Sequence, residues 1–188
     1  MEEKTDLRIQ RTYKLLTDAL LEMLNKENFE EITVRNLCQR AMVRPATFYK
    51  HFGDKYELFT FIVKEKQQQF HTENPFKSDP KRPQTYYVGL IEQTLHFMEE
   101  NKVLVKNVLD CSGSSALIDL LSEQIEYKVC CEFKEDERRG AILPGKPEIM
   151  APLFTGALIY AAKWWVQNDF KIARDEFVQE CVKILKLM

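Results

Sequence analysis

The stretch T-V-R-N-L-C-Q-R-A-M-V-R-P-A-T-F-Y-K-H-F-G-D-K, at positions 33–55, carries the most specific pattern in the chain. It predicts two short helices. The first spans 33–40 behind the N-cap residue Thr33, and the second begins near Pro45, which suits the first turn of a helix. Only a few residues separate them. Two short helices joined by a tight turn form the helix-turn-helix pattern of DNA-binding proteins.

Local charge supports an interaction with DNA. The stretch carries five Lys and Arg residues against Asp54 alone, a charge of +4 in a chain of net charge −2. Cations interleaved with Thr and Tyr hydroxyls are the groups that phosphate contact needs. The alternative is a solvated charged face on a helical bundle, which charge alone would favour.

The rest of the chain shows helical periodicity almost throughout, and no segment resembles a strand. Further helices are expected at 6–24, 55–71, 84–100, 103–109, 115–133, 148–168 and 174–187, and a polar loop at 135–147. Three Pro residues and no apolar period mark 73–83 as a linker. The sequence therefore predicts an all-α fold. We expect a helix-turn-helix DNA-binding domain at 1–72 and a helical ligand-sensing and dimerisation domain at 73–188.

Composition excludes several classes. The five Cys residues form no C-x-x-C pair, and the three His are scattered, so neither a disulfide framework nor a metal site is expected. Adjacent Cys130 and Cys131 leave a redox-sensing role open. We expect no cofactor and no catalytic residues, because no acid, base or nucleophile cluster is visible. The start of the chain has no apolar signal segment, and the apolar run at 149–162 is too short for a membrane span, so a cytoplasmic protein is expected.

Residues 6–60 resemble the DNA-binding domain of the TetR family of bacterial transcriptional regulators. The run T-F-Y-K-H-F-G-D-K-Y-E-L at 47–58 is the most specific part of the resemblance. It implies that residues 44–52 form a recognition helix that lies in the major groove of DNA. The resemblance implies base readout by Arg44, Pro45, Ala46 and Lys50, phosphate contacts by Thr47, Tyr49 and His51, and backbone or base contacts near Thr33, Arg35 and Lys55.

The chain departs from the family pattern at one position. The family usually has Gly in the turn, where Met42 stands. A Gly there serves a left-handed backbone conformation. A Met residue in that conformation would lower the free energy of unfolding by about 1–2 kcal/mol, unless the turn is reshaped.

The helix expected at 148–168 is apolar over too much of its circumference for one buried face, and the last expected helix offers a further apolar face. A central core helix would explain this, and so would a face that meets a second subunit. The TetR family forms its dimer through these two helices, and a two-fold dimer would read a near-palindromic operator. The residues expected at the interface are Phe154, Leu158, Ala161, Trp165, Phe177, Cys181 and Ile184.

The resemblance also implies a pocket for a small-molecule effector in the C-terminal bundle. Its expected lining residues, each of which could equally be core, are His96, Phe97, Met98, Cys111, Tyr127, Trp164 and Trp165. We therefore expect a repressor that an effector releases from DNA. An activator whose C-terminal domain binds a protein partner is the alternative, and an enzyme is a remote one.

Overall fold

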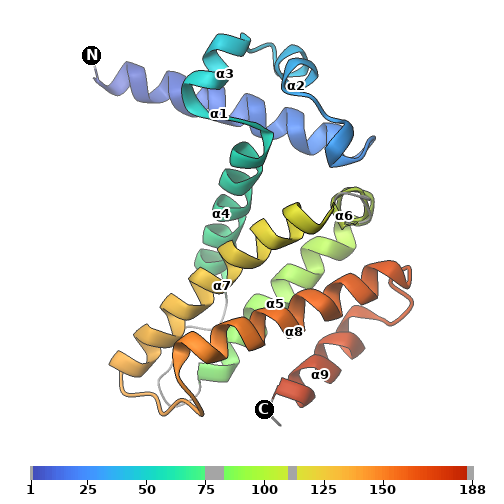
Figure 1. Cartoon of the computed structure of the whole chain (residues 1–188). Helices are drawn as coiled ribbons and strands as arrows, with labels where there is room; N and C mark the ends of the chain where they lie inside the picture. Colours follow the sequence, from blue (N-terminus) through green and yellow to red (C-terminus); the bar gives the residue numbers. More distant parts are fainter. Residues whose placement is uncertain (1, 75–82, 110–113, 186–188) are drawn as a thin grey trace. The chain divides into compact units, whose positions relative to one another are not determined.

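The structure is a computed structural model that describes residues 2–74, 83–109 and 114–185. The described ranges contain helices and no strand, which confirms the expected all-α class. In chain order (Figure 1) the elements are α1 (Glu2–Leu24), the 3-10 turn η1 (Phe29–Glu31), α2 (Val34–Arg40), α3 (Pro45–His51), α4 (Lys55–Glu73), α5 (Pro83–Glu100), α6 (Lys102–Leu109), α7 (Ser114–Arg138), α8 (Pro147–Gln167) and α9 (Arg174–Leu185). Most of the expected linker, residues 75–82, lies outside the described residues.

The chain forms two compact units. The first contains Met1–Lys64 and Val103–Leu117, and the second contains Glu65–Lys102 and Ile118–Met188. This division differs from the expected boundary at residue 72. The boundary between the units falls inside α4, between Lys64 and Glu65, and α6 belongs to the same unit as α1. The Asn107 side chain donates a hydrogen bond of 2.8 Å to the carbonyl oxygen of Leu24, at the end of α1. Such a contact between distant segments leaves no periodic signal in the sequence.

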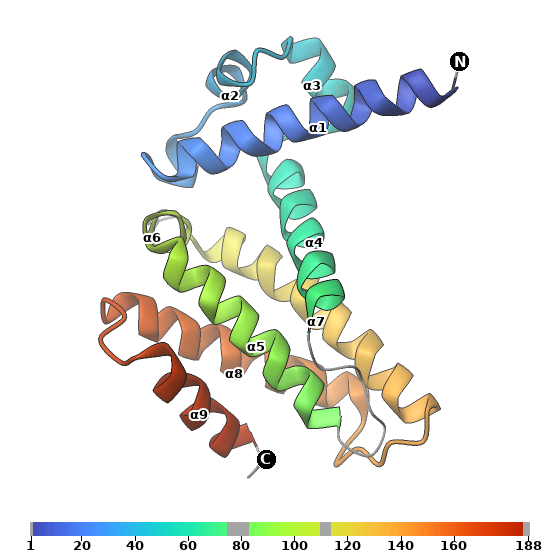
Figure 2. The same cartoon turned by 180° about the vertical axis from the view of Figure 1, so that it is seen from behind.

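The first unit has its own apolar core. Its fully buried side chains come from α1, η1, α2, α3 and α4, and they include Leu16, Leu20, Phe29, Leu37, Phe48 and Leu58. From both sides of the molecule (Figures 1 and 2), α2 and α3 lie against α1. This core packs against the inner side of the helix-turn-helix, so α3 is held in place without apolar contacts on its outer side.

The second unit is built from the end of α4 with α5, α7, α8 and α9. One cluster joins Tyr87 of α5, Phe133 of α7 and Ala151 of α8. At the other end of α8, the Trp165 ring is fully buried and stacks on Phe177 of α9 with centroids 5.1 Å apart. These contacts hold α5, α7 and α9 around α8.

One expectation about segment length was wrong. The polar loop expected to begin at 135 begins later, because α7 continues to Arg138. Glu135 pairs there with Arg138 and Arg139 one turn away, and such pairs support a polar helix end. The helix expected at 148–168 is α8, of 21 residues, and it contains the apolar run at 149–162. By length and composition alone it would suit a membrane span, a test that apolar helices of other kinds also pass.

Candidate DNA-binding interface

The recognition helix α3 is anchored by aromatic side chains on its inner side. Phe48 is fully buried and Phe52 is 4% exposed, as expected for core residues. The Tyr13 ring of α1 contacts Phe52 and also Phe61 of α4, with centroids 5.1 and 5.0 Å apart. Tyr13 also meets the edge of the His51 ring at 5.3 Å. The sequence therefore fixes the orientation of α3 through rings from three helices.

The opposite side of α3 is open to solvent. Arg44, which precedes the helix, is exposed, and so are Pro45, Ala46 and Lys50. Tyr49 is 59% exposed, although its ring edge meets Phe48. Thr47 and His51 are half-buried. The residues expected to contact DNA through α3 are thus brought together on one short helix and its N-cap, with the expected base-reading side chains exposed.

The start of α2 adds two of the expected residues. The Thr33 hydroxyl accepts a hydrogen bond of 3.1 Å from the backbone N–H of Asn36, so Thr33 is the N-cap that the sequence predicts. Thr33 itself is exposed, and so is Arg35 on the first turn. Both side chains are therefore accessible from solvent at the positively polarised end of α2.

The turn between α2 and α3 uses a left-handed residue. Met42 has φ = 53°, and its side chain is 88% exposed. The conformation is the one that Gly would supply at this position. The turn geometry is therefore kept, and the strain that the sequence predicted for Met42 is present in the backbone.

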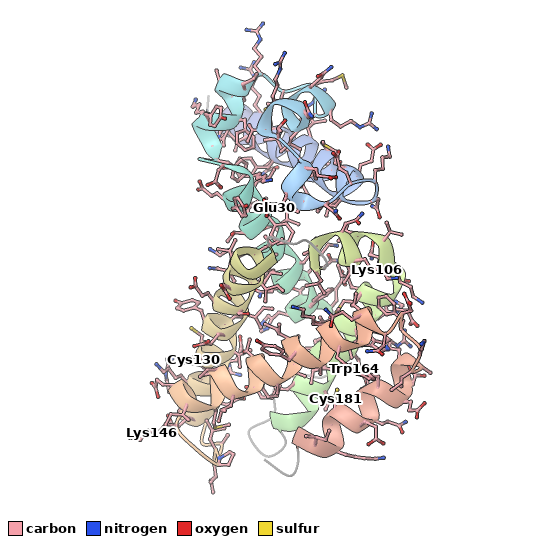
Figure 3. The ribbon with its side chains drawn as sticks, turned by 45° about the vertical axis from the view of Figure 1, so that its right-hand side comes forward. Glu30, Lys106, Cys130, Lys146, Trp164 and Cys181 are labelled. Atoms are coloured by element: carbon pink, nitrogen blue, oxygen red, sulfur yellow. The ribbon has the colours of Figure 1, made fainter. Side chains whose placement is uncertain are left out.

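Lys55 has a structural role that the sequence did not indicate, and the DNA contact expected of it stays a prediction. Its ammonium group donates hydrogen bonds to the carbonyl oxygens of Phe29 and Glu30, at 2.8 and 3.0 Å, and its side chain is 14% exposed. A carboxylate oxygen of Glu30, a residue marked in Figure 3, lies 3.7 Å from the ammonium nitrogen. Lys55 therefore holds η1 against α4, and two of its three N–H donors are already used within the first unit.

The start of α4 is also occupied by carboxylates. Asp54 accepts a hydrogen bond of 2.8 Å from the backbone N–H of Glu57, and the Gly53 N–H donates one of 2.6 Å to the Glu57 carboxylate. These acids satisfy backbone donors that would otherwise attract a phosphate. The expected phosphate contact at this helix start is therefore unsupported by the local geometry.

Sequence reasoning missed an ion pair that reduces the local charge. Arg40 donates hydrogen bonds through two nitrogens to the Glu22 carboxylate of α1, one of them 2.8 Å long. Lys26 donates a further one of 2.9 Å. Hydrogen bonds from Lys26 first, and then from Arg40, hold the pKa of Glu22 below its ordinary value of 4.5.

The cations that remain for DNA are fewer than the composition implies. Arg35, Arg44 and Lys50 make no ion pair within the described part of the chain. We call these three residues the unpaired cation set. Arg40 and Lys55 have partners inside the first unit, and only a signal between distant segments could have shown this.

The expected dimer residues differ in how far the protomer buries them. Phe154 contacts the rings of Tyr87 and Phe133 and is half-buried, whereas Trp165 and Phe177 are buried and leave little or no side-chain surface for a partner. Leu158, Ala161 and Cys181 are half-buried, and Ile184 is 58% exposed. An apolar helix gives no periodic clue to which of its faces is the outer one, so the expected interface stays a prediction.

A different face of α8 is apolar and exposed. Its exposed fractions are 58% for Ile149, 56% for Leu153, 75% for Tyr160 and 48% for Trp164. Their spacing of four, seven and four residues places them on one side of the helix. Trp164 and Cys181, labelled in Figure 3, mark α8 and the neighbouring α9. We call these four residues the outer α8 face.

The residues expected to line an effector pocket are not alike in their surroundings. Tyr127 is 73% exposed on α7, whereas Trp165 is fully buried and donates a hydrogen bond to the Ile172 carbonyl oxygen. His96 is exposed and its Nδ1 lies 2.7 Å from Arg174. Phe97 contacts Phe70 of α4, Met98 is buried, Trp164 belongs to the outer α8 face, and Cys111 lies outside the described residues. The effector pocket stays a prediction, and the different surroundings of these residues give no evidence that they line one cavity.

Comparison with known proteins identifies two matching families. Residues 16–60 match the model of "Bacterial regulatory proteins, tetR family", which covers the helix-turn-helix. Residues 89–187 match the model of a transcriptional regulator C-terminal region that belongs to the same group of families. The second match alone covers more than half of the chain.

Individual relatives agree. The chain is 33% identical over 63 residues to the HTH-type transcriptional regulator YxbF of Bacillus subtilis (strain 168), a match that spans 17% of that protein. A TetR transcriptional regulator from Streptococcus agalactiae 2603V has a TM-score of 0.65 at 16% identity, over 98% of both chains. The dihydroxyacetone kinase operon activator DhaS has a TM-score of 0.62 at 14% identity, over 94% of both chains. From its family matches, helix order and helix-turn-helix geometry, the chain belongs to the TetR family of bacterial DNA-binding transcriptional regulators.

Proposed function

We propose that the protein is a cytoplasmic repressor that binds a near-palindromic operator as a homodimer and leaves it when an effector binds in the second unit. The observation that carries the proposal is the two-sided character of α3. Phe48 and Phe52 hold the helix from inside, while Arg44, Tyr49 and Lys50 remain exposed. An anchored helix with accessible cations is suited to the major groove.

Arg44 is the residue most suited to reading a base. Its guanidinium group can donate two hydrogen bonds to O6 and N7 of guanine, which discriminates by about 1–3 kcal/mol when both form. Arg35 and Lys50 would add phosphate or base contacts. Thr33, Thr47, Tyr49 and His51 would position the helix through the DNA backbone.

The outer α8 face supports dimerisation. Its large apolar side chains are exposed in the protomer, and an apolar surface of this kind marks an interaction site in a soluble protein. Ile184 of α9 would extend it. A two-fold dimer would place two copies of α3 about one DNA turn apart, roughly 34 Å, which explains a near-palindromic site. An effector would act by binding the DNA-incompetent arrangement more tightly.

The test is selection from random duplex DNA with the purified full-length protein, followed by binding at several salt concentrations. We expect an enriched near-palindrome. Arg44→Ala should weaken binding and relax the preference at one position in each half-site, whereas Arg40→Gln should leave the preference unchanged. If no sequence is enriched and binding falls steeply with salt, only phosphate contacts are present, and the proposal fails.

An activator is the second candidate. The similar fold of DhaS is that of an operon activator by its name, and two apolar side chains outside the outer α8 face are strongly exposed: Tyr127 at 73% and Ile142 at 97%. Such side chains would suit a protein partner. Transcription from the selected operator in vitro separates the two candidates, since a repressor lowers the transcript level and an activator raises it.

A further inference from the structure

One aromatic ring of α1 reaches the last turn of the recognition helix. The centroid of the Tyr13 ring lies 5.3 Å from that of His51 in α3, and 5.1 Å from that of Phe52, the C-cap of the same helix. Phe61 of α4 completes the group, at 5.0 Å from Tyr13. The Tyr13 side chain is half-buried, and α1 passes beside α3 in both views of the fold (Figures 1 and 2). Tyr13 therefore joins three helices of the first unit.

The His51 side chain depends on this ring for its orientation. Among the residues that the structure describes, the imidazole makes no hydrogen bond and no ion pair, and its ring contact is with Tyr13, at an interplanar angle of 84°. Edge-to-face pairs of this kind are attractive and directional. Phe52, which is 4% exposed, and Phe61 hold the Tyr13 ring in turn. The orientation of His51 is thus set from α1 and α4, outside the recognition helix.

The nitrogen atoms of His51 suit a contact with the DNA backbone. An imidazole carries at least one N–H donor in either protonation state. Phosphate oxygens accept such hydrogen bonds, and contacts of this kind fix the register of a recognition helix on DNA. His51 lies in the last turn of α3, next to the exposed Lys50. A side chain that is held in one orientation before binding loses less conformational entropy on contact than a freely rotating one.

We propose that Tyr13 is a positioning residue for DNA binding, which holds the His51 imidazole in the orientation that meets a phosphate of the DNA backbone. The inference rests on the proposed function, because it deepens the account of how α3 meets the operator. The ring of Tyr13, and not its hydroxyl group, carries this role. Tyr13 precedes residues 16–60, which match the tetR family model, so that match does not assign it a function.

A double-mutant cycle on the full-length protein tests the inference. DNA binding is measured by fluorescence anisotropy on the selected operator and on a random-sequence duplex of equal length. Tyr13→Leu and His51→Ala should each weaken binding by roughly three- to ten-fold for each recognition helix bound. In the protein that carries both substitutions, the loss should equal that of His51→Ala alone to within about two-fold. A ring that acts through His51 has nothing left to position once the imidazole is removed.

Two further variants separate positioning from general packing. Tyr13→Phe keeps the ring and removes the hydroxyl group, so it should bind DNA as the wild type does. Phe59→Leu is the matched control, because the buried Phe59 ring packs on Phe29 at 5.2 Å in the same unit and makes no ring contact with α3 among the described residues. It should lower the thermal midpoint and keep the wild-type affinity for DNA. Binding is measured where circular dichroism shows every variant to be folded.

The imidazole signals in the NMR spectrum of the free protein give a second readout, which needs no DNA. The chain has three His residues, so single substitutions assign their Cε1–H signals. Tyr13→Leu should move the His51 signal, because the ring current of Tyr13 is lost, and should leave the signals of His71 and His96 in place. Tyr13→Phe should leave all three signals close to their wild-type positions.

The inference is overturned if either single substitution leaves DNA affinity unchanged, or if the two losses add fully in the cycle. It is also overturned if Tyr13→Phe binds as weakly as Tyr13→Leu, if Phe59→Leu loses as much affinity, or if the His51 signal does not move. Failure to enrich an operator would refute the proposed function alone, since a backbone contact is independent of sequence and the cycle on the random duplex still decides the role of Tyr13. An enriched operator with additive losses would refute the role of Tyr13 alone.

Discussion

The ammonium group of Lys55 donates a hydrogen bond to the carbonyl oxygen of Phe29 at 2.8 Å and lies 4.7 Å from the centre of the same residue's ring. The contact joins η1, which follows α1, to the first turn of α4. Since α4 and α1 both contact α3 through aromatic rings, this lysine helps to hold the frame in which the recognition helix sits.

We therefore predict that Lys55→Met lowers the free energy of unfolding by about 1–3 kcal/mol, because two carbonyl oxygens lose their donor in a partly buried site. Urea denaturation of the full-length protein measures this. Lys50→Met is the control, since Lys50 is exposed on α3 and should lose operator affinity without losing stability. A Lys55→Met protein with normal stability and weakened DNA binding would restore the phosphate-contact role that the sequence indicated.

Met42 gives a prediction in the opposite direction. Met42→Gly should raise the free energy of unfolding by about 0.5–1 kcal/mol, because relief of left-handed strain exceeds the added entropy of the unfolded chain. Met42→Ala keeps a Cβ atom in the same conformation and should be close to wild type. The prediction would be wrong if both substitutions changed the unfolding midpoint equally.

The Glu22 cluster predicts a pH dependence. Its pKa is lowered in the folded protein by Lys26 and then by Arg40, so the ionised carboxylate favours folding at pH values above its ordinary 4.5. This contribution is lost as the pH falls through the lower, folded-state pKa. Glu22→Gln should therefore be less stable than wild type near neutral pH, and the difference should disappear in acid.

Denaturation curves from pH about 7 down to about 3 would show this convergence. Glu92→Gln on α5 is a suitable control, because Glu92 is an exposed carboxylate of the second unit. Its difference from wild type should stay small across the range. A Glu22→Gln difference that persists unchanged at the lowest pH would contradict the assignment.

The outer α8 face predicts the oligomeric state. Leu153→Glu places a charge in the centre of the proposed interface, so we expect sedimentation to show a monomer where the wild type is a dimer. The side chain is 56% exposed in the protomer, so the helical content should be retained. Ile142→Glu changes an even more exposed residue, at 97%, and should remain dimeric. A dimeric Leu153→Glu protein would exclude this face.

The sequence predicted local features well and distant ones poorly. The cap at Thr33 and the left-handed turn at Met42 follow from residue types at fixed offsets, so a pattern can reveal them. The pairing of Arg40 with Glu22 joins residues 18 positions apart, and the hydrogen bond from Lys55 spans 26. Contacts of this kind depend on how helices pack, and charge counting along the chain assigns the same value to a paired and an unpaired cation.

The placement of α6 with α1 has a consequence for hybrid regulators. Fusing the first 72 residues to a foreign C-terminal domain would omit the buried side chains of Leu104, Val105 and Val108. It would also omit Asn107, which donates a hydrogen bond to the Leu24 carbonyl oxygen at the end of α1. The donor of the DNA-reading half in such a chimera must therefore supply two separate pieces of its gene, with α6 transferred along with the N-terminal segment. In evolutionary terms, the operator-reading half is encoded discontinuously, which restricts recombination between distant relatives.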